Sequence, residues 1–112
     1  MATIKSYTDL SQSKKLAEIL PLESADMYWD LLSKSNYAKV NDIGYCLCRT
    51  CVYAWGLAAL LDVLPYPYIE QNYKGKWTCR VEHGNTTYLL EDSNPINACV
   101  AMIEKLYGLN LL

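Results

Sequence analysis

The sequence predicts an α+β fold, in which helices surround a three-stranded antiparallel sheet. Apolar residues recur at helical spacing through residues 51–64 and again through residues 96–107. Between these stretches, residues 66–91 alternate between polar and apolar side chains and are interrupted by short turn signals. Because short links join consecutive strands, we expect an antiparallel meander with one covered face and one face in water.

Residues 51–64 are predicted to form a buried central helix that ends at Pro65. Its apolar positions form two stripes: Leu57, Leu60, Leu61 and Leu64, and Val52, Trp55, Ala59 and Val63. A helix that is apolar on most sides must be covered on most sides. A membrane span is excluded because the apolar run between Arg49 and Asp62 is shorter than the roughly 20 residues that a span needs.

The first 44 residues are predicted to be mainly helical. Thr8 can cap a helix over residues 9–20, with Gln12 near the return position of a capping box. Pro21 follows this stretch and would end the helix.

The chain from residue 24 to residue 49 gives weaker signals. Ser24 can cap a second short helix that runs to Leu32, and a loop is the alternative for this segment. Residues 33–44 are polar and are predicted to be a surface connection. Residues 45–49 are predicted to form a short strand that leads into the central helix.

The strands of the meander are predicted over residues 66–73, 76–82 and 86–91. Pro67 places the first strand at an edge of the sheet, because proline cannot donate to a strand ladder. Lys74-Gly75 and His83-Gly84-Asn85 have the composition of tight turns.

The last helix has the clearest boundaries. Asn94 is a favourable N-cap and Pro95 suits the first helical position. Gly108 is predicted to end the helix in the left-handed conformation. This helix is expected to pack on one face of the sheet, through its apolar stripe.

Length and composition indicate one domain over residues 1–112, with a helical segment (1–44) followed by a helix–meander–helix unit (45–112). The hydrophobic content of 52% is too high for a disordered chain, and the net charge of -2 gives no bulk attraction to nucleic acid or anionic lipid. The chain shows no signal peptide, and its five cysteines form no secretory framework. We therefore expect a cytoplasmic protein without a membrane partner.

Four segments occur in an order that resembles an uncharacterised family of short proteins encoded by phages and mobile elements of gut bacteria. They are residues 12–16 (QSKKL), 24–27 (SADM), 54–61 (AWGLAALL) and 94–98 (NPINA). The resemblance covers nearly the whole chain and implies an accessory phage or prophage protein. It implies no activity and no catalytic residue.

A cysteine triplet is the candidate metal site. Cys46, Cys48 and Cys51 are closely spaced, and either His83 or Cys79 could supply a fourth zinc ligand. The spacing lacks the two clean pairs of a structural zinc site, so packing of small apolar thiols is the preferred interpretation and no metal or other cofactor is expected. A Cys–His nucleophile would need further groups that the sequence lacks, so the chain is predicted not to be an enzyme.

Aromatic and basic residues gather around the first predicted hairpin. They are the candidate partner-binding residues Tyr66, Tyr68, Tyr73, Lys74 and Arg80, with Trp77 assigned either to them or to the core. Such residues anchor protein interfaces, which indicates a non-enzymatic interaction protein that binds itself as a homodimer or binds a host protein.

Two alternatives stay open at this point. The first is a nucleic-acid-binding module, because aromatic side chains interleaved with basic side chains can bind single-stranded nucleic acid. The order of the elements is also similar to that of the double-stranded-RNA-binding domain. The start of the last helix, residues 94–97, departs from that domain because it carries no basic residue. The second alternative is a small zinc-binding protein.

Overall fold

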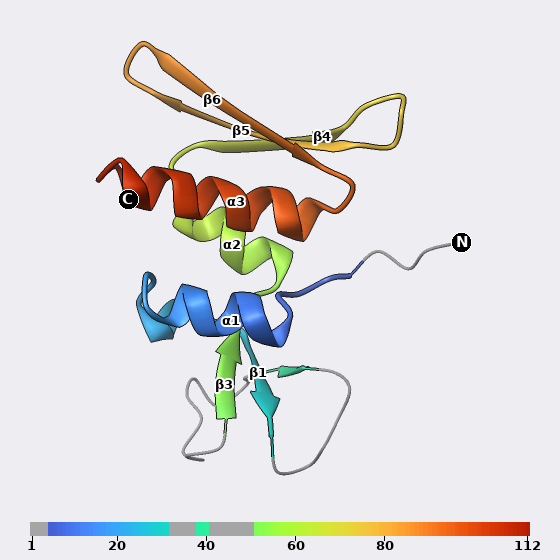
Figure 1. The fold of residues 1–112 in the computed structure, drawn as a ribbon, viewed down its shortest axis with the longest axis vertical. Coiled ribbons are helices and arrows are strands. Elements are labelled where there is room, and N and C mark those ends of the chain that lie inside the picture. The colour runs from blue at the N-terminus through green and yellow to red at the C-terminus, as the bar shows by residue number, and fades with distance from the viewer. Residues whose placement is uncertain (1–4, 32–37, 41–50) are drawn as a thin grey trace. The chain divides into compact units, whose positions relative to one another are not determined.

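The computed structural model describes residues 5–31, 38–40 and 51–112 (Figure 1). It confirms the α+β class, with three α-helices and two antiparallel sheets among the described residues. The chain divides into two compact units, Ser6–Ala59 and Leu60–Leu112, which are described separately below. No helix among the described residues is both long enough and apolar enough to cross a membrane.

The first unit combines helix α1 (Leu10–Ala17) with a small antiparallel sheet. The strands of this sheet are β1 (Met27–Asp30), β2 (Lys39–Val40) and β3 (Cys51–Ala54), in the order β2-β1-β3. A short 3-10 helix over Leu22–Ser24 precedes β1.

Helix α1 begins one residue later than the sequence indicated. Its N-cap is Asp9, whose carboxylate accepts the N–H of Gln12 at 2.7 Å, while the side chain of Gln12 accepts the N–H of Asp9 at 3.1 Å. This reciprocal pair completes the capping box that Gln12 had suggested. Thr8 is instead fully buried, so its prediction as the cap was wrong.

The predicted helix over residues 24–32 was wrong, because its centre forms strand β1. β1 pairs along its length with β3, which places Tyr28 opposite Tyr53 and Trp29 opposite Val52. Cross-strand pairs of aromatic and β-branched side chains stabilise a sheet, and this gain comes from residues far along the chain. The strand predicted over residues 45–49 and the connection predicted over residues 33–44 fall largely outside the described residues.

The predicted central helix is only partly correct. Its first four residues form strand β3, and helix α2 begins at Leu57 and ends at Val63. Trp55 lies between the two elements and is fully buried, as expected. The backbone N–H of Gly56 donates to a carboxylate oxygen of Asp26 at 2.8 Å, and a Cβ on Gly56 would lie 3.1 Å from the other carboxylate oxygen. This close approach explains a glycine at the turn from strand to helix.

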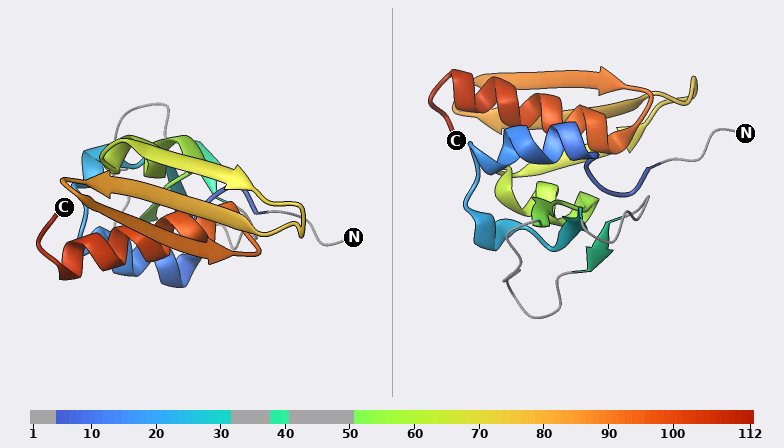
Figure 2. Two further views of the ribbon diagram at one scale, coloured as in Figure 1. Left: turned by 90° about the horizontal axis from the view of Figure 1, so that it is seen from above. Right: turned by 60° about the horizontal axis from the view of Figure 1, so that its bottom comes forward.

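The second unit contains the predicted meander, which the structure confirms. Its strands are β4 (Pro67–Gln71), β5 (Trp77–His83) and β6 (Thr86–Asp92), and neighbouring strands are antiparallel in the order β4-β5-β6. Gly75 and Gly84 have positive φ angles of 81° and 62° in the two connecting turns. The left view of Figure 2 shows the three strands side by side.

Helix α3 (Pro95–Gly108) packs on one face of this sheet, with its main contacts to β5 and β6. Cys79 and Val81 of β5 and Ile96, Cys99 and Ile103 of α3 are fully buried. The side chain of Asn94 accepts the N–H groups of Ile96 and Asn97 at 2.8 and 3.3 Å, which confirms the predicted cap. The helix ends at Gly108 as predicted, but the left-handed conformation is taken by Asn110, with φ 59°, and not by Gly108.

Candidate functional site

The candidate site lies on the face of the β4-β5-β6 sheet that α3 does not cover. Strand register places Tyr68, Arg80 and Leu89 in one row across the three strands. Successive side chains point to opposite faces of a strand, and Cys79 and Val81 are buried on the α3 side. The row from Tyr68 to Leu89 therefore lies on the opposite, solvent-facing side, which we call the outer face.

Tyr68 and Arg80 form the ordered centre of the outer face. The guanidinium of Arg80 lies over the Tyr68 ring, 4.5 Å from its centroid, in a cation–π arrangement. The Tyr68 hydroxyl donates to the carboxylate of Glu70 at 3.1 Å. These two contacts hold one aromatic ring and one cation in place before any partner arrives, and such preorganisation reduces the entropy lost on binding.

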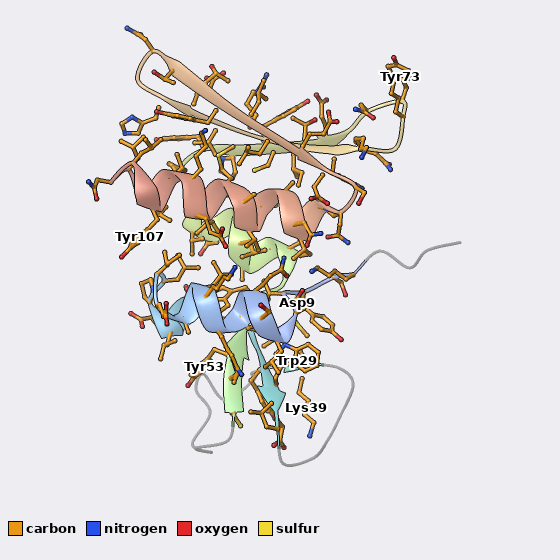
Figure 3. All side chains as sticks on the ribbon, viewed as in Figure 1. Asp9, Trp29, Lys39, Tyr53, Tyr73 and Tyr107 are labelled. Atoms are coloured by element: carbon orange, nitrogen blue, oxygen red, sulfur yellow. The ribbon has the colours of Figure 1, made fainter. Side chains whose placement is uncertain are left out.

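Tyr66 and Tyr73 lie at the two ends of β4 and are almost completely exposed, at 90% and 93%. Figure 3 shows Tyr73 projecting from the hairpin between β4 and β5. The ammonium of Lys74 lies 5.7 Å from the centroid of the Tyr73 ring. Four of the five predicted partner-binding residues thus lie on β4 or in its flanking turns, and Arg80 lies opposite one of them, Tyr68, on β5.

The backbone of Tyr66 is unusual. Its φ angle is 46°, although it lies between Pro65 and Pro67. A residue before proline prefers an extended conformation, and a bulky residue rarely takes the left-handed one. Such a conformation costs about 1–3 kcal/mol. The backbone of Tyr66 therefore destabilises the fold, although the Tyr66 ring contributes little to the core.

The outer face carries more acidic than basic side chains. Glu70, Glu82 and Glu91 lie on this face together with the single cation of Arg80. Lys74 and Lys76 belong to the hairpin turn at the end of the strands. The face therefore has a tyrosine, an arginine and an exposed leucine at its centre, with a largely acidic border.

Sequence reasoning missed two features of this site. Leu89 is 58% exposed beside Arg80, and only the strand register reveals its neighbours. The positive φ of Tyr66 had no local signal, because Pro67 after it favours an extended conformation. Trp77 is removed from the site, because register places it opposite Gln71 and Asp92 on the α3 side of the sheet.

The candidate zinc ligands do not form a site in the described part of the chain. Cys46 and Cys48 lie outside the described residues, and Cys51 is disulfide-bonded, which removes it as a thiolate ligand. His83 is exposed at the end of β5. No group of three His, Cys, Asp or Glu side chains suited to a metal occurs among residues 5–31, 38–40 and 51–112.

Two free thiols meet inside the second unit instead. Cys79 of β5 and Cys99 of α3 are both fully buried. The side-chain hydrogen bond between them lowers the pKa of Cys79 and, together with burial, raises the pKa of Cys99 far above its usual range. A fully buried thiol is inaccessible to a substrate, so this pair is part of the core and not a nucleophile.

Comparison with known proteins finds no matching family model, no matching curated protein and no matching solved structure. The arguments for a function therefore come from the residues of the chain itself.

Proposed function

We propose that this chain is a non-enzymatic interaction protein whose outer face and β4 turns bind another protein. The resemblance noted above supports the role of a phage or prophage accessory factor that acts on a host protein. The proposal rests above all on Tyr66, whose strained backbone presents an almost fully exposed ring to solvent. Strain of this kind concentrates at functional sites, because it is retained only where the surrounding structure or selection maintains it.

The chemistry of the surrounding residues supports a protein partner. Tyrosine and arginine are the usual anchors of protein interfaces, and Tyr68 and Arg80 are already ordered against each other. Exposed Leu89 adds an apolar side chain to the same row. The acidic border, with Glu70, Glu82 and Glu91, would meet a partner surface of basic character.

The alternative function, nucleic-acid binding, is supported by Tyr73 with Lys74 in the hairpin and by Tyr68 with Arg80. The same face carries three carboxylates, which oppose a phosphate backbone. We therefore prefer the protein partner.

Site-specific photocrosslinking tests the proposal. A photoreactive amino acid replaces Tyr66 or Tyr73 in one set of proteins and Tyr107 in the control. Tyr107 is also exposed, at 49%, but projects from α3 (Figure 3). In a bacterial lysate, we expect one protein adduct from the first two positions and none from Tyr107. Excess unlabelled wild type should compete with this adduct, and excess of the double variant Tyr66→Ser and Tyr73→Ser should not.

Three outcomes would contradict the proposal. The first is the same adducts from all three positions, which would indicate random capture. The second is no adduct at any position. The third is tight, salt-dependent binding of single-stranded oligonucleotides that the double variant loses, which would establish the nucleic-acid alternative.

A further inference from the structure

The two edges of the β4-β5-β6 sheet differ in the backbone groups that they expose. In the β4–β5 hairpin, the N–H of Asn72 donates to the carbonyl of Lys76 at 2.8 Å. Along an antiparallel strand, the backbone N–H and C=O groups of one residue bond to the neighbouring strand, and those of the next residue point away from it. Because Asn72 bonds to β5, the alternate residues Glu70 and Tyr68 also bond to β5 through their backbone groups. The backbone groups of Pro67, Ile69 and Gln71 point outward.

The same alternation fixes the direction of the backbone groups in β6. In β5, Thr78 and Arg80 bond to β4, so Cys79, Val81 and their alternate neighbours bond to β6. The backbone groups of their partners Leu90 and Tyr88 therefore point toward β5. The backbone groups of Thr87, Leu89 and Glu91 consequently point away from the sheet, and no backbone hydrogen bond from any described residue reaches them.

Pro67 makes the two edges unequal. It occupies one of the three outward positions of β4, where it has no N–H to offer to an added strand. The preceding residue, Tyr66, then turns the chain with a positive φ. β6 is longer and contains no proline, so its three outward residues offer a complete donor–acceptor pattern. An edge of this kind is a template for another strand.

We propose that a second copy of this chain pairs with β6, antiparallel and around a two-fold axis at Leu89. Leu89 then lies opposite Leu89 of the second copy, and Thr87 lies opposite Glu91 of the second copy. Each of these residues donates its N–H to the carbonyl of the residue opposite it and accepts that residue's N–H with its own carbonyl. The result is a continuous sheet of six strands, made from two of the three-stranded sheets in the structure.

The side chains select this register. Leu89 is exposed in the single chain and would be covered by its own counterpart. On the α3 side, half-buried Tyr88 would face Leu90 of the second copy. Thr87 can donate its hydroxyl to the facing carboxylate of Glu91. An axis moved to Glu91 would instead place two carboxylates directly opposite each other, which is unfavourable.

Helix α3 would lie close to its counterpart in this arrangement. It packs beneath β5 and β6, so the two copies of α3 would lie near each other below the joined strands. The exposed positions Ala101, Glu104 and Gly108 recur at helical spacing, and two of them are among the smallest residues. Small side chains permit a close approach of two helices.

Charge changes at residue 87 test the pairing and its register. We expect sedimentation velocity to show a concentration-dependent dimer for the wild type. Thr87→Glu places a carboxylate opposite Glu91 of the second copy, twice per dimer, and should weaken the dimer roughly 2- to 30-fold. Thr87→Lys should strengthen it by a similar factor. The double variant Thr87→Glu with Glu91→Lys forms the same ion pairs with the charges exchanged, so it should reverse the loss and strengthen the dimer about as much as Thr87→Lys does.

A matched control and a backbone measurement complete the experiment. Gln71→Glu adds the same charge at an exposed position of β4, the opposite edge of the sheet, and should leave the dimer unchanged. Amide hydrogen exchange should slow at Thr87, Leu89 and Glu91 as the dimer forms, and should stay unchanged at Ile69 and Gln71.

The proposal is overturned by a wild type that sediments as a monomer at every concentration, or by a dimer that protects Ile69 and Gln71 instead. It is also overturned if Thr87→Glu and Gln71→Glu have equal effects. If a peptide partner alone protects the β6 amides, the edge binds that partner and not a second copy. Because Tyr66 and Tyr73 take no part in this contact, failure here leaves the crosslinking result unaffected.

Discussion

Thr8 and Trp55 exchange two hydrogen bonds across the first unit, although they are far apart in the sequence. The N–H of Thr8 donates to the carbonyl of Trp55 at 2.9 Å, and the N–H of Trp55 donates to the Thr8 hydroxyl at 3.0 Å. The indole N–H of Trp55 donates to the Ser24 hydroxyl at 2.9 Å. This arrangement connects the start of α1 to the turn between β3 and α2, and it accounts for every polar donor of a fully buried tryptophan.

We predict that Trp55→Ala lowers the free energy of unfolding by about 3–5 kcal/mol, the usual range for removing a large aromatic side chain from a core. Chemical denaturation followed by circular dichroism measures this change. Tyr73→Ala removes a large ring from an exposed turn and should change stability by less than about 0.5 kcal/mol. A loss below about 1 kcal/mol for Trp55→Ala would mean that the ring is not the centre of this unit.

The Thr8 hydroxyl should matter on its own. It lies 2.8 Å from the Ser13 hydroxyl, which in turn donates to the carbonyl of Asp9 at 2.7 Å, and both hydroxyl-bearing residues are fully buried. Thr8→Val keeps the shape but leaves the buried N–H of Trp55 without an acceptor. We expect a loss of about 1–3 kcal/mol in the free energy of unfolding. Thr86→Val on exposed β6 is the matched control, and equal effects of the two changes would disprove the role of the buried hydroxyl.

The second unit was largely predictable from the sequence because its determinants are local. Alternating side chains identify β5, Gly75 and Gly84 identify the turns, and Asn94 with Pro95 identifies the start of α3. Each signal lies within a few residues of the element that it specifies, so short windows of sequence contain it.

The first unit was harder to predict because its determinants are distant in sequence. Val52 and Tyr53 favour a strand, but the apolar residues that follow them continue at helical spacing. Pairing with β1 stabilises the strand over these residues. Just before α2, the N–H of Gly56 donates to the carboxylate of Asp26, which is 30 positions away in the sequence. Asp30 at the end of β1 likewise has a partner elsewhere in the sequence, because it forms an ion pair with Lys39 at 3.6 Å.

The candidate site shows the same division. Its residues could be named from the sequence because tyrosines, lysines and an arginine cluster within residues 66–80. Their arrangement could not, because the contact of Arg80 with Tyr68 and the position of Leu89 depend on strand register. The outward direction of the β6 backbone likewise follows only from the register and from the hydrogen bond at Asn72.

Thiol labelling should separate the three cysteines in the described part of the chain into two classes. Cys79 and Cys99 are buried and free, whereas Cys51 is disulfide-bonded. We expect a thiol reagent to label Cys79 and Cys99 only after denaturation, and to label Cys51 only after denaturation and reduction. Peptide mass spectrometry identifies each labelled position. Rapid labelling of Cys99 in the folded protein would contradict its burial, and labelling of Cys51 without reductant would contradict the disulfide.

Tyr66 should be a position where stability and binding oppose each other. Asparagine tolerates the left-handed conformation better than tyrosine, and little packing is lost because the Tyr66 ring is 90% exposed. We therefore predict that Tyr66→Asn raises the free energy of unfolding by about 0.5–1 kcal/mol and weakens binding of the partner. Tyr73→Asn is the matched control, because Tyr73 is equally exposed but has no positive φ, and it should weaken binding without stabilising the fold. Urea denaturation measures the first effect, and competition with the crosslinked adduct measures the second. If Tyr66→Asn destabilises the protein, the tyrosine ring makes contacts that outweigh its backbone strain, and the strain no longer argues for a function at this turn.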